Sequence, residues 1–176
     1  GWTSEPALRK AAFNATSILT GTGYASADYM LWGAFPVTLL FLMGLVGGCA
    51  GSTCCSIKIF RFQLLYAAVS TQVRQIVSPR GVFTPRYEGR PVSDDVMSSV
   101  MGFFGLFVVT VGVVAMLLGL MGLDPIIAVS GAVTAVANIG PGLGPDIGPT
   151  GNFADLPGEA KWVLAFAMLI GRLELM

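Results

Sequence analysis

The stretch "VANIGPGLGPDIGPTG", Val136 to Gly151, is the part of this sequence that decides the fold. It is rich in glycine and proline, which end helices and favour turns. The residues before it, from Pro125, are uncharged, and another apolar run begins at Trp162. The meaning of this loop therefore depends on whether its flanking segments lie in water or in a membrane.

The composition indicates a membrane protein. Of the 176 residues, 54% are hydrophobic and only 11% are charged, whereas charged residues make up about 25% of an ordinary soluble domain. Residues 29–57, 96–123 and 125–145 carry no charge. A membrane-spanning helix needs about 20 apolar residues, so we expect the first two stretches to span. The helical part of the third, Pro125 to Ala137, would cover only about 20 Å and is too short.

The charged residues are unevenly distributed and indicate an orientation. Six of the ten basic residues lie between Lys58 and Asp95. The loops at the other ends of the spans carry acidic residues, namely Asp28, Asp124, Asp146, Asp155 and Glu159. Because cytoplasmic loops of membrane proteins are enriched in Lys and Arg, we expect residues 58–95 to be cytoplasmic. The net charge is zero, which gives no argument for nucleic-acid binding.

An earlier unit of the chain has the same design. A helix should begin at Ser4-Glu5-Pro6 and end near Leu19, where "TGTGYAS" follows. The next apolar run is interrupted by "GGCAGSTCCS", Gly47 to Ser56, and resumes to about Val77 as a broken membrane helix. Both units thus have a short helix, a glycine loop and a spanning helix, with little sequence identity. Two spans separate the glycine loops, so the loops should face the same side, as parallel repeats.

The units divide the chain into three segments. Residues 1–78 hold the first short helix, its glycine loop and the broken helix. Residues 79–93 are a cytoplasmic connection, either a small hairpin between Val82 and Val92 or a plain loop. Residues 94–176 hold the second unit, truncated in its last helix. With no signal peptide and no initiator Met, the chain is expected to be an internal fragment.

Non-helical backbone inside a membrane suggests a pore. Bare amides in lipid cost several kcal/mol each, so such backbone is tolerated only where it is buried in protein or lines a water-filled cavity. Glycine turns can present successive carbonyl oxygens, which replace the hydration shell of a monovalent cation. The competing interpretation is that both glycine stretches are surface loops. No Ser/His/Asp set, P-loop or acid/base pair occurs in the sequence, so we predict no enzymatic activity.

Four motifs resemble the Trk/Ktr/HKT superfamily of potassium transporters, most closely the bacterial Trk-type uptake subunits. They are "NATSILTGTGYASADY" (Asn14 to Tyr29), "GSTCCSIKIFR" (Gly51 to Arg61), "ANIGPGLG" (Ala137 to Gly144) and "GRLEL" (Gly171 to Leu175). The resemblance implies an all-α integral membrane fold of four parallel helix-pore loop-helix repeats, similar to a potassium channel. Residues 1–78 would supply the third repeat without its outer helix, and residues 94–176 most of the fourth.

The resemblance also implies two sets of site residues. The selectivity filter, which binds potassium, would comprise Thr20, Gly21, Thr22 and Gly23 in the third repeat and Asn138, Ile139 and Gly140 in the fourth. The gate would comprise an intramembrane loop with Gly47, Gly48, Gly51, Ser52 and Thr53, together with Arg172, which would project into the pore. An alternative for Arg172 is that it snorkels to a membrane interface near Glu174.

The gate segment departs from the family pattern. Family members usually have further glycines after Ser-Thr, whereas this chain has Cys54-Cys55-Ser56, which are less free in φ and ψ. The three cysteines, Cys49, Cys54 and Cys55, occur in a chain without histidine and make a poor metal site. We interpret them as small packing residues.

The sequence therefore predicts potassium uptake across the bacterial inner membrane, through a pore lined by backbone carbonyls and gated by the intramembrane loop. The alternatives are a broken-helix secondary transporter and a non-conducting membrane scaffold. The resemblance implies a homodimer of the full-length protein in the lipid bilayer and a cytoplasmic regulatory subunit that binds NAD or ATP. No covalent cofactor is expected, and nucleotide would act only through that partner. The sequence does not distinguish a channel from transport coupled to protons or sodium.

Overall fold

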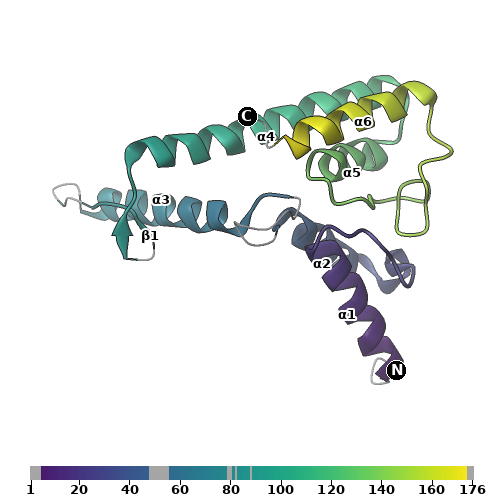
Figure 1. Cartoon of the computed structure of the whole chain (residues 1–176), viewed down its shortest axis with the longest axis horizontal. Coiled ribbons are helices and arrows are strands. Elements are labelled where there is room, and N and C mark those ends of the chain that lie inside the picture. The colour runs from purple at the N-terminus through teal and green to yellow at the C-terminus, as the bar shows by residue number, and fades with distance from the viewer. Residues whose placement is uncertain (1–4, 48–55, 79–80, 82, 88, 174–176) are drawn as a thin grey trace.

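The computed structural model describes residues 5–47, 56–78, 81, 83–87 and 89–173 (Figure 1). The elements in chain order are α1 (Glu5–Leu19), the 3₁₀ helix η1 (Tyr29–Trp32), α2 (Ala34–Leu45), α3 (Ile59–Val77), β1 (Arg86–Tyr87), β2 (Arg90–Pro91), α4 (Asp94–Leu120), α5 (Pro125–Val136) and α6 (Gly158–Arg172). Apart from one short hairpin, every regular element is a helix. The predicted all-α fold is confirmed.

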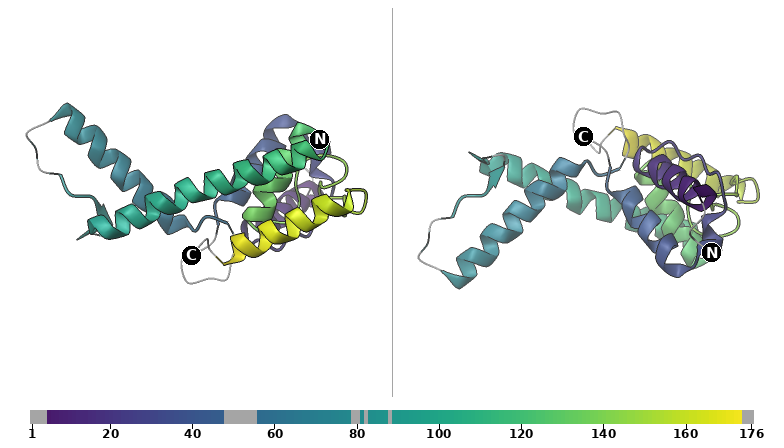
Figure 2. Two further views of the ribbon diagram at one scale, coloured as in Figure 1. Left: turned by 90° about the horizontal axis from the view of Figure 1, so that it is seen from above. Right: turned by 90° about the horizontal axis from the view of Figure 1, so that it is seen from below.

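The helices form a body from which an arm protrudes (Figure 1). In the body, α4, α5 and α6 pack against one another, and α1 and α2 lie beside them. The arm consists of α3, the β1–β2 hairpin and the N-terminal half of α4. Views from above and below show α3 and α4 diverging toward their far ends, with the hairpin at the start of α4 (Figure 2).

The core of the body surrounds α5. Leu118 of α4, Ala132 of α5, Ala160 of α6 and Ile147 of the loop after α5 have no exposed surface. Small residues at such contacts let helices approach closely, which is a common way to pack helices in a membrane. The loop that follows α5 is therefore held by the most completely buried part of the molecule.

The short uncharged helix predicted from the sequence is α5. The Asp124 side chain caps its N-terminus by accepting a hydrogen bond from the Ile126 amide (3.0 Å), and Pro125 lies in the first turn. The helix ends at Val136, directly before the glycine-rich stretch. Its 12 residues are fewer than the roughly 20 that a membrane span needs.

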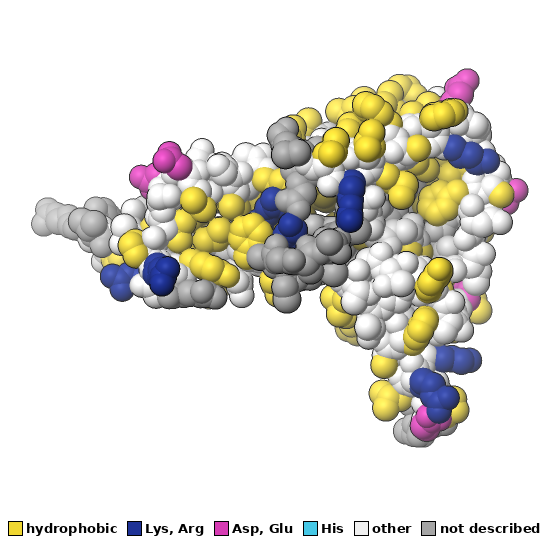
Figure 3. Space-filling model, in the orientation of Figure 1, with side chains coloured by type: hydrophobic (Ala, Val, Ile, Leu, Met, Phe, Trp, Pro, Cys, Tyr) yellow, Lys and Arg dark blue, Asp and Glu magenta, His cyan; other side chains and the backbone are white. Residues whose placement is uncertain are grey.

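Among the described residues, α4 is the only helix long and apolar enough to cross a membrane. It has 27 residues, and its most apolar window has a mean hydropathy of 2.6 with only 17% of that window buried. Exposed side chains of α4, such as Val108 and Met116, and of α6, such as Trp162 and Phe166, give the body an apolar surface. Figure 3 shows hydrophobic side chains gathered over this part. A surface of this kind is suited to apolar surroundings.

Residues 29–57 are interrupted at two places, of which the sequence predicted only the second, after Val46. The 3₁₀ helix η1 ends at Gly33, whose φ is 100°, and α2 then has only 12 residues. The absence of charged residues from this stretch could not reveal the break at Gly33, because glycine is itself uncharged. The predicted interruption after α2 is confirmed at its ends, where Val46 and Ile57 form an isolated β-bridge. Residues 48–55 lie outside the described part of the chain.

The arm has a hairpin at its tip and aromatic contacts between α3 and α4 at its base. At its tip the connection forms the hairpin rather than a plain loop, with Tyr87 paired to Arg90 in antiparallel register. At its base the Arg61 guanidinium lies 3.7 Å from the centroid of the Phe103 ring, a cation–π contact. The rings of Phe62 and Phe104 meet edge to face there, with centroids 5.6 Å apart. These four residues are termed the aromatic seam below.

Candidate functional site

The two glycine loops predicted for the filter lie side by side. We term Thr20–Tyr24 the first turn and Ala137–Pro141 the second turn. A Cβ atom built on Gly140 would lie 3.5 Å from the Gly23 Cα, and one built on Gly23 would lie 3.1 Å from the Ile139 carbonyl oxygen. The structure therefore brings together residues that are far apart in the sequence and that were predicted to share one site.

Both turns close the preceding helix with the same backbone hydrogen bonds. In the first turn, the amides of Thr20, Gly21 and Thr22 donate to the carbonyls of Thr16, Ile18 and Ser17 at 2.9, 3.1 and 2.9 Å. In the second turn, the amides of Ala137, Asn138 and Ile139 donate to the carbonyls of Val133, Ala135 and Thr134 at 2.9, 3.1 and 3.0 Å. These bonds correspond one to one when Gly23 is aligned with Gly140. The two turns thus have one backbone design.

Each turn also has positive φ at two corresponding positions. Gly21 and Asn138 have φ of 69° and 53°, and Gly23 and Gly140 have φ of 78° and 113°. Glycine adopts these angles without strain, and asparagine tolerates the left-handed region better than most residues do. The motifs "TGTG" and "NIG" therefore meet the same conformational requirement with different residues.

The conformation leaves carbonyl oxygens without protein partners. Within the described part of the chain, six carbonyls of the two turns accept no hydrogen bond, namely those of Gly21, Thr22, Gly23, Asn138, Ile139 and Gly140. Carbonyls beyond the last helical turn lack the usual amide donor four residues ahead. Two adjacent rows of such oxygens, with no ionised side chain on either turn, have the chemistry of a site for a dehydrated monovalent cation.

The threonine hydroxyls of the first turn support its backbone. The Thr20 hydroxyl donates to the Thr16 carbonyl at 2.8 Å and lies 2.8 Å from the Thr22 hydroxyl. The resemblance placed Thr20 and Thr22 in the selectivity filter. The hydrogen bonds of their hydroxyls stabilise the backbone of the turn.

The side chains of the second turn are directed into the protein. The Asn138 side-chain amide donates to the Met168 carbonyl of α6 at 3.0 Å. Ile139 is only 3% exposed, and its Cδ1 would lie 3.0 Å from a Cβ built on Gly44 of α2. The second turn is therefore held from two sides, by α6 and by α2.

The last turn of α6 touches the end of α5. A Cβ built on Gly171 would overlap the Val136 carbonyl oxygen, so only glycine allows this approach. Arg172 is the next residue, the last of α6, and is exposed in this chain. The predicted gate arginine thus lies close to the base of the second turn, and its role stays a prediction.

Of the predicted intramembrane loop, only its two ends, Gly47 and Ser56, belong to the described chain. Gly47 is buried and donates a hydrogen bond to the Ile57 carbonyl at 2.9 Å. Gly48, Gly51, Ser52 and Thr53 lie outside the described residues, as do Cys49, Cys54 and Cys55.

Two polar residues behind the turns were missed by the sequence reasoning. Asn14, which is 1% exposed, donates to the Ser26 hydroxyl and accepts from the Ser26 amide, both at 3.1 Å. In the other unit, the Ser130 hydroxyl accepts from the Leu143 amide at 3.1 Å. Each side chain links a short helix, α1 or α5, to the extended segment that follows its turn. A polar residue on an otherwise apolar helix face was the available signal.

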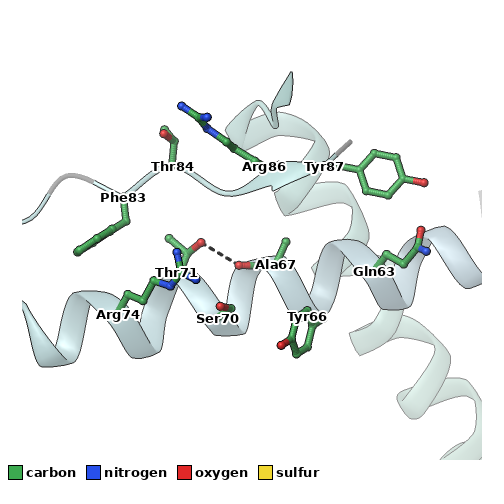
Figure 4. Close-up of a pocket in the computed structure, with 10 residues that line it drawn as sticks. All are labelled: Gln63, Tyr66, Ala67, Ser70, Thr71, Arg74, Phe83, Thr84, Arg86 and Tyr87. Atoms are coloured by element: carbon green, nitrogen blue, oxygen red, sulfur yellow. Dashed lines mark hydrogen bonds between the residues drawn. The ribbon is translucent and has the colours of Figure 1, made fainter. Parts of the chain in front are cut away.

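One cavity lies beside the two turns, and another lies in the arm. One, of about 460 Å³, is lined by Gly23 and Gly140 and by the facing side of α6, including Leu164 and Met168. The other, of about 670 Å³, lies in the arm between α3 and the segment that enters β1 (Figure 4). Its lining includes Arg74 and Arg86, and none of its described residues carries a carboxylate.

Comparisons with known proteins agree with this geometry. The family model described as TrkH, cation transport protein, matches residues 4–176. The Trk system potassium uptake protein TrkI of Halomonas elongata is 49% identical over 169 residues, which cover 96% of this chain and 34% of that protein. The Trk system potassium uptake protein TrkH of Vibrio parahaemolyticus is 35% identical over 171 residues, with 96% and 34% covered.

The structural comparison extends over the whole chain. The crystal structure of the potassium transporter TrkH from Vibrio parahaemolyticus matches with a TM-score of 0.90 at 34% identity, covering 99% of this chain and 37% of that one. The chain spans about a third of the length of the curated relatives it matches. Its helices, its two turns and its sequence thus agree with one family, and the chain belongs to the TrkH family of cation transport proteins.

Proposed function

We propose that the chain is part of a potassium uptake protein in which the first and second turns form two segments of the selectivity filter. The observation that carries this proposal is the set of six unpaired carbonyl oxygens on two turns in contact. A cation that sheds its water needs several oxygens in replacement, and neutral carbonyls let it leave again. Potassium is proposed as the substrate because the relatives are named potassium uptake proteins.

Two turns do not surround an ion, so a complete ion path would need filter segments from the rest of the full-length protein. Residues 1–78 would act as the third repeat, residues 79–93 as the cytoplasmic connection and residues 94–176 as the fourth repeat. Two further repeats in the rest of the full-length protein would close the filter around one axis. Potassium would then move down its electrochemical gradient, with the protein's own residues fixing the positions of the oxygens.

The gate is proposed at the break after α2, with Gly47, Gly48, Gly51, Ser52 and Thr53, and at Arg172. Two observations support the position: the break begins at Gly47 beside the described residue Ile57, and Arg172 follows Gly171, which touches the base of the second turn. A guanidinium near the path of a cation raises the barrier to its passage by like-charge repulsion.

The full-length protein is proposed to lie in the bacterial inner membrane as a homodimer. A cytoplasmic regulatory subunit that binds NAD or ATP would dock on the arm. The arm cavity supports this surface, because the described residues of its lining include two arginines and several hydroxyl groups (Figure 4). Such a lining favours an acidic partner surface.

The proposal is tested by adding a methyl group to each turn of the full-length protein. Gly23→Ala and Gly140→Ala force an L-residue into positive φ, and a Cβ on Gly23 also crowds the Ile139 carbonyl oxygen. We expect rubidium uptake by cells without other potassium uptake systems to fall at least about tenfold, with the protein still inserted in the membrane.

The matched control is Gly112→Ala on α4, where a Cβ meets open space and uptake should be unchanged. Unaltered uptake and selectivity in both turn variants would sink the filter assignment. A scaffold would show no rubidium uptake even in the unmodified protein, and a secondary transporter for an organic substrate would show none that potassium competes for.

A further inference from the structure

Ser56 connects the broken helix of one unit to the second turn of the other. It is the residue before Ile57, where the described chain resumes after the break. Its backbone amide donates to the Ala137 carbonyl at 2.7 Å. Its hydroxyl approaches the same oxygen at 3.4 Å and also donates to the Gly44 carbonyl of α2. One residue thus joins α2 and the start of the second turn.

The partner of Ser56 is a specific carbonyl. Ala137 caps α5 and is directly followed by Asn138, Ile139 and Gly140, whose oxygens are unpaired. A carbonyl at a helix end needs a donor from elsewhere, and Ser56 supplies it. The Ala137 carbonyl is therefore the last oxygen of the second turn that is fixed by protein before the free ones begin.

Ser56 holds this position in an unfavourable conformation. Its φ is 73°, and it is one of only three non-glycine residues with positive φ in the described part of the chain. Serine is rarely found in this region, so the surrounding contacts must over-determine it. Asn138, across the same contact network, is another of the three.

A second contact links the same two parts. The Ile139 side chain packs on Gly44, at 3.0 Å from where a Cβ would be, and Gly44 offers its carbonyl to Ser56. The end of α2, Ser56 and the second turn therefore form one partly buried cluster. All residues of this cluster belong to the described chain. The exposed faces of the arm differ, because the relatives are about three times as long and their remaining residues can cover such faces.

We propose that Ser56 is a positioning residue of the filter. It fixes the direction of the Ala137 carbonyl and so sets the spacing of the next oxygens, on which discrimination between cations of different size depends. The residue itself does not touch the ion. This inference rests on the proposed function of the turns, and it adds a specificity determinant in the broken helix.

The test removes the hydroxyl in two ways in the full-length protein. Ser56→Ala keeps the amide and the strained φ, whereas Ser56→Gly keeps the amide and relieves the strain. Both variants lose the hydroxyl that anchors Ser56 to the Gly44 carbonyl and so loosen its amide on Ala137. Both should lower the preference for rubidium over sodium in competition uptake by about threefold or more. The rate at saturating rubidium should change less than this ratio.

The matched control is Thr38→Ala, which removes an exposed hydroxyl of α2 that bonds only its own helix; its selectivity should equal that of the unmodified protein. Wild-type selectivity in both Ser56 variants overturns the inference, also where the amount of protein falls. The proposed function then still stands if Gly23→Ala and Gly140→Ala lose uptake. Unchanged uptake in those two variants refutes the function itself, whatever the Ser56 variants do.

Discussion

The first and second turns have the same backbone but are held by different neighbours. The first turn is braced by its own Thr20 and Thr22 hydroxyls, and Tyr24 at its end is 75% exposed. The second turn is enclosed by the body: Asn138 bonds α6, Ile139 fills a space on α2, and Ser56 bonds Ala137. The requirement on the two turns is therefore one of backbone conformation, which two unlike sequences satisfy by local and by long-range support.

The largest effect should come from the long-range support of the second turn. Gly171→Ala places a methyl group against the Val136 backbone, so α6 must move away from α5. We expect a loss of stability of about 3 kcal/mol, at the upper end for overpacking, and loss of rubidium uptake. Thermal unfolding of the purified full-length protein measures the first effect. Gly119→Ala on α4, with open space for its Cβ, should leave both unchanged; an equal loss there would refute the contact.

An intermediate effect should come from the ties behind the turns. Asn14→Ala leaves the Ser26 amide without its acceptor, and Ser130→Ala does the same to the Leu143 amide. Each should lower stability by about 2 kcal/mol, the cost of a buried unsatisfied donor. Asn14→Asp keeps the acceptor for Ser26 but sets a buried carboxylate against the Lys10 carbonyl, so it should lose more. If Asn14→Ala and Ser130→Ala differ widely in thermal unfolding, the two units are not supported in equivalent ways.

The smallest effect should come from the local brace of the first turn. Thr22→Val removes one hydroxyl of an exposed pair, and we expect a loss of about 0.5 kcal/mol in stability. Rubidium selectivity should shift only slightly, because the hydroxyls brace the backbone. Thr22→Ser, which keeps the hydroxyl, is the control. Complete loss of selectivity in Thr22→Val would instead assign this hydroxyl to the ion.

Much of the fold could be predicted from local sequence signals. Asp124-Pro125 marks the start of α5, the charge gap gives α4, and glycine clusters give both turns, because capping, hydropathy and conformational freedom act over a few residues. The break at Gly33 was missed, since a single glycine in an apolar run is a weak signal. The hairpin was one of two open alternatives.

The site could be predicted only in part. The glycine motifs identified which residues lie at the turns, but the contact of Gly23 with Gly140 is set by how α1 and α5 are placed by the other helices. The ties of Asn14 and Ser56 were missed because their partners are distant along the chain or carry no motif. Their polar character in apolar surroundings was visible, and the structure supplies the partner.

The arm has a mechanical consequence. Its two helices contact each other at the aromatic seam, and β1, at the start of α4, also contacts α3. Because α3 has contacts at both places, we expect a partner bound at the hairpin to bias the position of the near end of α3. That end begins at Ile59, three residues after Ser56.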